Sequence, residues 1–269
     1  MPRSDLRSRA VLGRRARAAV AGAALAWAAA APPATAGSDA LWSIVNGLCV
    51  PDQRMLNSPA PCAAVDLDGG EANGFAVLKD LRGRTQFLLI PTLRIAGMED
   101  PRLGAPGLPN YWRAAWSARH FVEAAAPEAA FAREDMAMTI NGAGARTQNQ
   151  LHIHLDCPRV DVARELRKRA DEIGAAFADF SMFGKTYRAR RILGEAPAPD
   201  PFLLVAADAP SAPLADNSIA VFGARFSGAP GFVLLARKAP HGRVHLEDLQ
   251  DHGCGVLEAR PAREAGAPN

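Results

Sequence analysis

Residues 148–156 read Gln-Asn-Gln-Leu-His-Ile-His-Leu-Asp, and this alternation of polar and apolar side chains is the strongest guide to the fold. Successive side chains of a β-strand point to opposite faces, so positions 151, 153 and 155 would face an apolar core. The opposite face would then carry a polar row: Gln148, Gln150, His152, His154 and Asp156. The stretch therefore predicts a strand with two imidazoles, two amides and a carboxylate on one face.

Three explanations of this polar row are open from the residues alone. It could be the solvated face of an ordinary antiparallel strand. Alternatively, His152, His154 and Asp156 could supply two nitrogens and an oxygen to a metal ion. The third explanation is nucleophilic catalysis, in which one imidazole attacks phosphorus while its neighbours orient it.

The first 36 residues have the composition of a secretory signal. Six arginines precede an uninterrupted apolar run from Ala18 to Ala31, and Ala34-Thr35-Ala36 places small residues where a signal peptidase cleaves. The run is shorter than the roughly 17–25 residues that a comfortable bilayer span requires. We therefore expect residues 1–36 to be a signal peptide or an N-terminal membrane anchor, and residues 37–269 to form the functional domain.

This N-terminal segment also accounts for the basic character of the chain. It holds six of the 31 lysines and arginines but only one of the 28 acidic residues. The rest of the chain consequently carries a small net negative charge. Binding of nucleic acid through bulk charge is therefore not expected.

Four cysteines follow the N-terminal segment: Cys49, Cys62, Cys157 and Cys254. An even number of cysteines in an exported chain favours disulfides. The sequence allows three pairings. We favour Cys49–Cys62, which closes a short proline-rich loop, together with Cys157–Cys254, which would join the histidine strand to the C-terminal tail. Export and disulfides together indicate a periplasm-like location.

Apolar patterning divides the remaining chain into short helices and strands. Strands are expected at 75–79, 86–91, 136–141, 202–206, 219–226 and 232–237, and helices at 40–47, 110–126 and 161–179. This order indicates the α+β class, with helices packed on an antiparallel sheet. The strand pattern of the second half loosely repeats that of the first. Two structurally similar halves are therefore one possible arrangement, although no sequence repeat supports it.

The order of strand, glycine turn and histidine strand over residues 138–155 resembles the signature of the histidine-triad superfamily. Members of that superfamily hydrolyse or transfer nucleotides through a histidine–nucleotide intermediate. The chain is more specifically similar to the CDP-diacylglycerol pyrophosphatases. The matching motifs are Leu-Cys-Val-Pro at 48–51, Pro-Ala-Pro-Cys at 59–62, Phe-Ala-Val-Leu-Lys-Asp at 75–80, Phe-Leu-Leu-Ile-Pro-Thr at 87–92, Pro-Asn-Tyr-Trp at 109–112, Gln-Asn-Gln-Leu-His-Ile-His-Leu-Asp-Cys at 148–157 and Asp-His-Gly-Cys at 251–254.

The resemblance implies hydrolysis of CDP-diacylglycerol to CMP and phosphatidate without a cofactor. In that superfamily the site consists of three alternating histidines, and the middle one attacks phosphorus. If the register places Gln148 before the triad, His154 is the attacking residue, His152 orients it, and Asp156 takes the third position. If Gln150 holds the first position instead, His152 attacks. We take His154 as the expected nucleophile, with Asp156 positioning the water.

The resemblance also implies that the substrate is met at a membrane surface. Donors to its phosphate oxygens are expected among five residues: Asn141, Arg146, Gln148, Asn149 and Gln150. The protein would be anchored in the inner membrane with a periplasmic domain, or soluble in the periplasm if the signal is cleaved. A metal-dependent hydrolase and a non-catalytic module that binds lipid or nucleotide are the alternatives. His252 is expected to belong structurally to the disulfide-linked tail.

Overall fold

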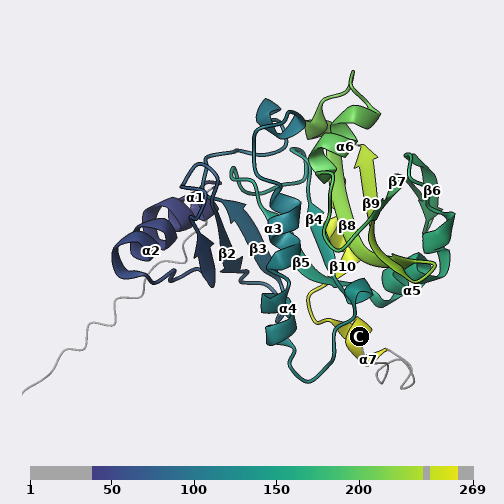
Figure 1. The fold of residues 1–269 in the computed structure, drawn as a ribbon, viewed down its shortest axis with the longest axis horizontal. Coiled ribbons are helices and arrows are strands. Elements are labelled where there is room, and N and C mark those ends of the chain that lie inside the picture. Colours follow the sequence, from purple (N-terminus) through teal and green to yellow (C-terminus); the bar gives the residue numbers. More distant parts are fainter. Residues whose placement is uncertain (1–37, 239–242, 260–269) are drawn as a thin grey trace, which may run out of the picture. The chain divides into compact units, whose positions relative to one another are not determined.

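The computed structural model describes residues 38–238 and 243–259, and it confirms the α+β class. The expected signal or anchor lies outside these described residues. Within them, the strands form one ten-stranded sheet with helices packed on it (Figure 1). Neighbouring strands of this sheet are all antiparallel. No helix of this part of the chain is long and apolar enough to cross a membrane.

The strands are β1 (Ala64–Asp66), β2 (Phe75–Lys79), β3 (Phe87–Pro91), β4 (Ala137–Ile140), β5 (Ile153–Pro158), β6 (Ala178–Met182), β7 (Lys185–Leu193), β8 (Asn217–Phe226), β9 (Ala229–Lys238) and β10 (Gln250–Asp251). The α-helices are α1 (Ala40–Ile44), α2 (Val50–Leu56), α3 (Tyr111–Ser117), α4 (His120–Ala125), α5 (Val160–Arg169), α6 (Pro201–Asp208) and α7 (Gly255–Glu258). A π-helical segment at Val45–Cys49 joins α1 to α2, and short 3-10 turns include η4 (Ala170–Glu172) and η6 (Glu247–Leu249).

The strand order shows two halves with the same arrangement. It runs β1-β2-β3-β5-β4-β8-β9-β7-β6, with β10 paired to β5. In the first half, the hairpin β2–β3 is followed by α3 and α4 and then by β4 and β5, and β5 lies between β3 and β4. In the second half, the hairpin β6–β7 is followed by α6 and then by β8 and β9, and β9 lies between β7 and β8. The halves meet through β4 and β8.

One face of the sheet is covered by α3, α4 and α6, which share a single core across both halves. Trp112 of α3 packs against Phe202 of α6, with ring centroids 5.2 Å apart. Trp116, one turn further along α3, meets Phe232 of β9 edge-on at 4.8 Å. Leu155 of the histidine strand belongs to the same buried cluster. Because this core crosses the β4–β8 junction, it ties the two halves together through apolar burial.

The opposite face is covered at two separate places. The helical segment 40–56 packs on Leu88 and Ile90 of β3. Helix α5 packs on Phe222 of β8 and Leu235 of β9. Strands β5 and β4 lie between these places in the sheet order. His154 pairs in register with Leu88, so its side chain faces the strip between the two helical layers, beside which the C-terminal segment pairs with β5.

Two disulfides join segments of this fold, and they are the pairs that the sequence favours. Cys49–Cys62 links the helical segment to the loop before β1, with Cα atoms 5.7 Å apart. Cys157–Cys254 links β5 to the C-terminal tail across 97 residues of sequence, with Cα atoms 5.1 Å apart. The second disulfide therefore fixes the C-terminal segment beside the histidine strand.

Several expected elements differ from those observed. Residues 202–206, expected as a strand, lie in helix α6, because Asp200 accepts a hydrogen bond from the Phe202 amide and Pro201 begins the helix. The helix expected at 161–179 ends in the turn η4, and strand β6 begins at Ala178. Strands β6 and β7 were not expected at all. The helix expected at 110–126 is divided into α3 and α4, and the one at 40–47 extends to Leu56.

Candidate active site

The alternation of residues 150–156 is kept in the structure, but the polar face is buried. Strand β5 begins at Ile153, so His152 lies just before it. On the polar face, His152 is 9% exposed, His154 is 6% exposed, and Gln150 and Asp156 are completely buried. The explanation of this row as a solvated strand face is therefore wrong. Burying four polar side chains requires partners for each of them.

His152 is held in one tautomer by the backbone. Its Nδ1 lies 2.7 Å from the carbonyl oxygen of Gln150. A carbonyl only accepts hydrogen bonds, so Nδ1 carries the proton and Nε2 keeps its lone pair. Burial lowers the pKa of His152, which keeps the ring neutral at pH 7.

His154 has the opposite arrangement of its ring nitrogens. The Gln86 side-chain nitrogen lies 2.8 Å from His154 Nδ1 and 2.9 Å from a carboxylate oxygen of Glu247. Because the same amide nitrogen donates to that carboxylate, it also donates to Nδ1, and the ring proton is on Nε2. Burial, reinforced by the neighbouring His152, lowers the pKa of His154 to about 3. The two rings lie 4.9 Å apart, one presenting a lone pair and the other an N–H.

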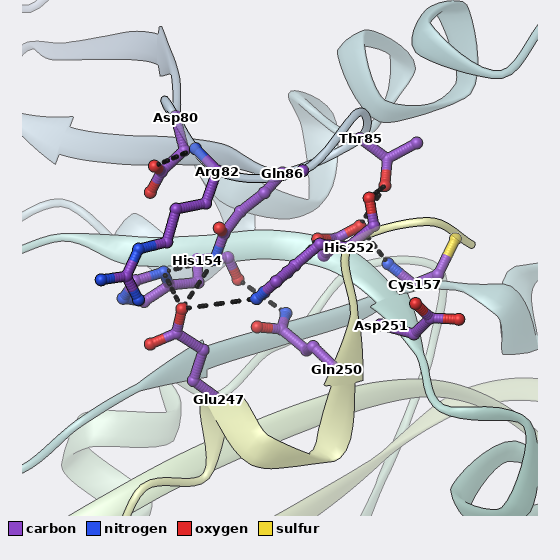
Figure 2. Close-up of polar contacts among 12 residues, drawn as sticks. Asp80, Arg82, Thr85, Gln86, His154, Cys157, Glu247, Gln250, Asp251 and His252 are labelled. Carbon is purple, nitrogen blue, oxygen red and sulfur yellow. Dashed lines mark hydrogen bonds and ion pairs between the residues drawn. The ribbon is translucent and has the colours of Figure 1, made fainter. Parts of the chain in front are cut away.

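The C-terminal segment supplies the other side of the site (Figure 2). The two-residue strand β10 pairs with the end of β5, placing Asp251 opposite Cys157. The Gln250 side chain donates to the carbonyl oxygen of His154 at 3.2 Å and accepts from the hydroxyl of Thr139 at 2.9 Å. These bonds fix the segment over β5, so that Glu247 lies close to His154 and His252 lies close to Asp156.

Asp156 is directed toward His252 and the β2–β3 loop. One of its oxygens lies 2.8 Å from His252 Nδ1, and the other accepts from the Thr85 hydroxyl at 2.6 Å. The Cys157 amide donates to that second oxygen at 2.9 Å. Burial raises the pKa of the Asp156 carboxyl, while these hydrogen bonds oppose the shift. The same contact with Asp156 raises the pKa of His252.

Glu247 lies between His154 and His252. Its Oε1 is 3.4 Å from His154 Nδ1 and 3.9 Å from His252 Nε2. Asn141 holds this carboxylate in place: its side-chain nitrogen donates to Glu247 at 3.1 Å, and its oxygen accepts from the Leu246 amide at 3.1 Å. Burial disfavours the charge of Glu247, but the nearby imidazoles and hydrogen bonds outweigh it and lower the pKa. Asn141, expected to contact phosphate, thus positions a carboxylate.

The residues expected to bind phosphate are mostly engaged in holding loops. Gln148 accepts from the Leu41 amide at 3.2 Å, which ties this loop to α1. The Gln150 side chain donates to the carbonyl oxygens of Pro91, at the end of β3, and of Leu93, each at 3.0 Å. The Asn149 amide donates to the backbone at Ser38. Arg146 forms an ion pair with Glu99.

Two arginines nevertheless contribute positive charge near the histidines. Arg82, from the loop between β2 and β3, extends toward His154 (Figure 2), and its charge lowers the pKa of that ring. Arg146 acts in the same direction on His152. Arg82 forms no ion pair within the described part of the chain. Its exposed guanidinium is therefore free to meet an anion at the site.

A metal site built from His152, His154 and Asp156 does not form. In residues 38–238 and 243–259, the one close group of three possible ligands combines Asp156 with Cys157 and Cys254. Those two sulfurs are joined in a disulfide and cannot bind a metal as thiolates. Asp156 is instead bonded to His252, away from the other two side chains of the expected set.

Sequence reasoning missed four members of the site: Arg82, Gln86, Glu247 and His252. The first two lie in the loop of the β2–β3 hairpin, and the last two lie in the C-terminal segment. The Asp-His-Gly-Cys motif at 251–254 was the available signal, because Cys254 is bonded to the residue that follows Asp156. A disulfide partner of the histidine strand brings its neighbours to that strand.

The antiparallel α+β sheet buries two neutral imidazoles beside two carboxylates, which are groups suited to nucleophilic and acid–base catalysis. A sequence model described as CDP-diacylglycerol pyrophosphatase matches residues 36–258. The chain belongs to the CDP-diacylglycerol pyrophosphatase family. A curated relative, the CDP-diacylglycerol pyrophosphatase of Yersinia pestis, is 37% identical over 234 residues, which cover 84% of this chain and 88% of that protein. The resemblance noted from the motifs is confirmed, and a non-catalytic binding module is set aside.

Proposed function

We propose that this chain hydrolyses the diphosphate of CDP-diacylglycerol, releasing CMP and phosphatidate through a covalent histidine–nucleotide intermediate. The name of the Yersinia pestis relative supports the substrate. The observation that carries the covalent route is the tautomer of His152, whose Nδ1–H is bonded to the Gln150 carbonyl. A neutral imidazole with a free Nε2 lone pair needs no further base to attack phosphorus at pH 7.

We therefore propose His152, in place of His154, as the residue that attacks phosphorus. His154 Nδ1 accepts from Gln86, so its Nε2 bears a proton and has no lone pair to offer. The triad register then begins at Gln150, with His152 in the middle and His154 in the third position. Asp156 falls beyond the triad, where it contacts His252 rather than the reacting phosphorus.

The remaining polar groups would stabilise charge on the phosphoryl oxygens. His154 Nε2–H would donate to a non-bridging oxygen as negative charge develops in the transition state. Arg82 would place its guanidinium against the diphosphate, and hydrogen bonds between such charged groups are stronger than those between neutral groups. Arg146 remains bonded to Glu99 and would act on the site at longer range.

The proposed substrate is a lipid, so the reaction would take place at a membrane surface. The N-terminal segment of residues 1–36 would direct the chain to an exported location, as an anchor in the inner membrane or as a cleaved signal. The disulfides fit an oxidising compartment.

Trapping the intermediate tests the proposal. Wild-type protein is mixed briefly with CDP-diacylglycerol that is labelled on the cytidine-side phosphate, and it is quenched in base. A phosphorus–nitrogen adduct is stable in base and labile in acid, so wild type should retain label that acid releases. His152→Gln should retain none. His154→Gln should still form adduct, at a rate lower by about 10²–10³-fold because it loses a donor to the transition state.

His120→Gln is the matched control, because His120 contacts the Ser117 carbonyl and the Phe121 ring in α4 and touches no site residue within the described part of the chain. It should label and turn over like wild type. If wild type turns over without any adduct, the covalent route is wrong. If His154→Gln abolishes the label and His152→Gln keeps it, the nucleophile is His154.

A further inference from the structure

His252 has the position and partner of an acid–base catalyst, although it lies far from the histidine pair in sequence. We propose that His252, oriented by Asp156, transfers the proton in both halves of the reaction: to the departing phosphatidate, and then from the attacking water. This inference rests on the proposed covalent route and adds a third histidine to it. Asp156 is then a positioning residue.

The ring of His252 is fixed at one nitrogen and open at the other. Nδ1 lies 2.8 Å from the completely buried carboxylate of Asp156, whose charge keeps the proton on that nitrogen. The side chain is 33% exposed, whereas the His154 side chain is 8% exposed. Nε2 faces Glu247 at 3.9 Å, a separation longer than a direct hydrogen bond. A leaving oxygen or a water can therefore approach Nε2.

Three parts of the chain hold His252 in this orientation. The amides of Arg84 and Thr85 donate to its carbonyl oxygen at 3.0 and 3.4 Å. Gly83 packs so closely that a Cβ at that position would lie 2.2 Å from the Cβ of His252. The disulfide of Cys254 anchors the segment two residues later. Such fixation of a side chain before substrate binds is what efficient proton transfer requires.

The charges that face His252 favour its protonated form. Asp156 of β5, Glu247 of η6 and Asp80 of the β2–β3 loop are all acidic, and together they raise the pKa of the ring. The protonated ring of His252 in turn acts against protonation of His154. The site therefore holds one imidazole that is ready to give a proton beside two that are neutral.

The stereochemistry of the two steps allows one group to serve both. His152 Nε2 attacks phosphorus, and the bond to the bridging oxygen breaks on the opposite side. That oxygen takes the electron pair and accepts the proton of His252 Nε2, and phosphatidate leaves. Water then enters from the same side, His252 takes its proton, and the phosphorus–nitrogen bond breaks. CMP is released, His152 regains its lone pair, and His252 is again protonated.

The test compares two leaving groups in wild type and His252→Gln. The p-nitrophenyl ester of CMP expels nitrophenolate, which leaves without a proton. With this probe, His252→Gln should give a burst of about one nitrophenolate per chain at close to the wild-type rate, followed by turnover slowed by about 10²–10³-fold. With the unsubstituted phenyl ester of CMP, whose leaving oxygen is much more basic and needs a proton, the same variant should already be slow in forming the labelled adduct.

A merely structural role for His252 would slow the nitrophenolate burst as strongly as the later turnover, and that result would overturn the proposal. Asp156→Asn provides a second test, which does not depend on whether His252→Gln folds. Steady-state turnover of the nitrophenyl ester should rise with pH as His252 loses its proton. Removing the Asp156 charge should move this rise to lower pH, and an unmoved profile contradicts the assignment.

Failure of the underlying function would look different. Wild type that neither turns over CDP-diacylglycerol nor gives a burst would defeat the proposed function itself. Wild type that shows both, with His252→Gln equal to it on both substrates, would defeat only the role of His252.

Discussion

The two halves of the sheet share a strand order but differ at the position where the site lies. Strand β5 of the first half presents His154 and Asp156 on one face, and His152 lies just before the strand begins. Strand β9, which holds the same place in the second half, is buried and apolar from Phe232 to Ala236. The shared arrangement therefore provides the scaffold, and the chemistry depends on what each half adds to it.

The hairpins of the two halves show the same contrast. Strands β6 and β7 are joined by Phe183 and Gly184, both with positive φ, in the tight turn that suits a two-residue connection. Strands β2 and β3 are joined by the longer loop 80–86, which supplies Arg82, Thr85 and Gln86 to the site. The first half therefore differs from the second in three features: a polar strand, a longer hairpin loop, and the C-terminal segment that packs on both.

The largest expected effect separates chemistry from packing in the two equivalent strands. His152→Gln should lower kcat for CDP-diacylglycerol on the order of 10⁴-fold or more, because it removes the nucleophile. Val233→Thr in β9 should leave kcat within about twofold but destabilise the fold by about 1–3 kcal/mol, because it buries a hydroxyl. Steady-state kinetics and urea unfolding of both variants check this. Loss of activity in Val233→Thr without loss of stability would contradict the division.

The second effect concerns the disulfides. Replacing Cys157 and Cys254 by serine should cost about 4–5 kcal/mol of unfolding free energy, since the closed loop spans 97 residues. Replacing Cys49 and Cys62 should cost about 3 kcal/mol, since that separation is 13 residues. Only the first replacement should also lower kcat, because it frees His252. Denaturant unfolding with parallel assays measures both, and equal kcat in the two variants would argue against a role of the tail in the site.

The third effect is the pH dependence of stability that arises from His154 in the first half. Folding lowers the pKa of His154 from 6.5 to about 3, so between these pH values the unfolded chain binds a proton that the folded chain does not bind. The free energy of unfolding is therefore highest above pH 6.5 and decreases as the pH falls toward 3. Urea unfolding between pH 7 and pH 4 should show wild type losing on the order of a few kcal/mol, and His154→Gln losing less. Parallel curves for the two proteins would rule out this contribution.

The smallest effect compares charges at the two hairpins. Arg82→Gln should lower kcat/KM for CDP-diacylglycerol by about 10–30-fold, since it removes a charged partner of the diphosphate. Its stability should change by less than about 0.5 kcal/mol, because the side chain is exposed. Lys185→Gln, beside the β6–β7 turn, removes the same charge from the second half and should leave kcat/KM unchanged. Equal losses in the two variants would point to a general charge effect.

Local sequence patterns were sufficient to predict segments in which the apolar residues follow a single helical or strand period. The alternation of residues 148–156 predicted a strand that the structure contains from Ile153 onward, and the hairpin at 75–91 predicted β2 and β3. Residues 202–206 failed because a short apolar run fits a helix or a strand equally, and the deciding cap comes from Asp200. The ends of α5 failed because apolar residues such as Phe177 continue the helical spacing into the approach to β6.

The site was predictable only where it lies within one segment. His152 and His154 were found together because they lie two residues apart in one alternating segment. Which of them attacks stays a prediction, because the lone pair that each ring offers depends on contacts with Gln150 and Gln86 in the folded chain. Glu247 and His252 carry no periodic signal, and their place is set by tertiary pairing of β10 with β5.

The tail that completes the site is held partly by a bond that depends on the redox environment. The covalent tie between β5 and the segment of Glu247 and His252 exists only while Cys157 and Cys254 are oxidised. In a reducing environment, non-covalent contacts such as strand pairing and the hydrogen bonds of Gln250 would hold this segment beside β5. The position of His252 is therefore expected to be fixed most firmly where disulfides form.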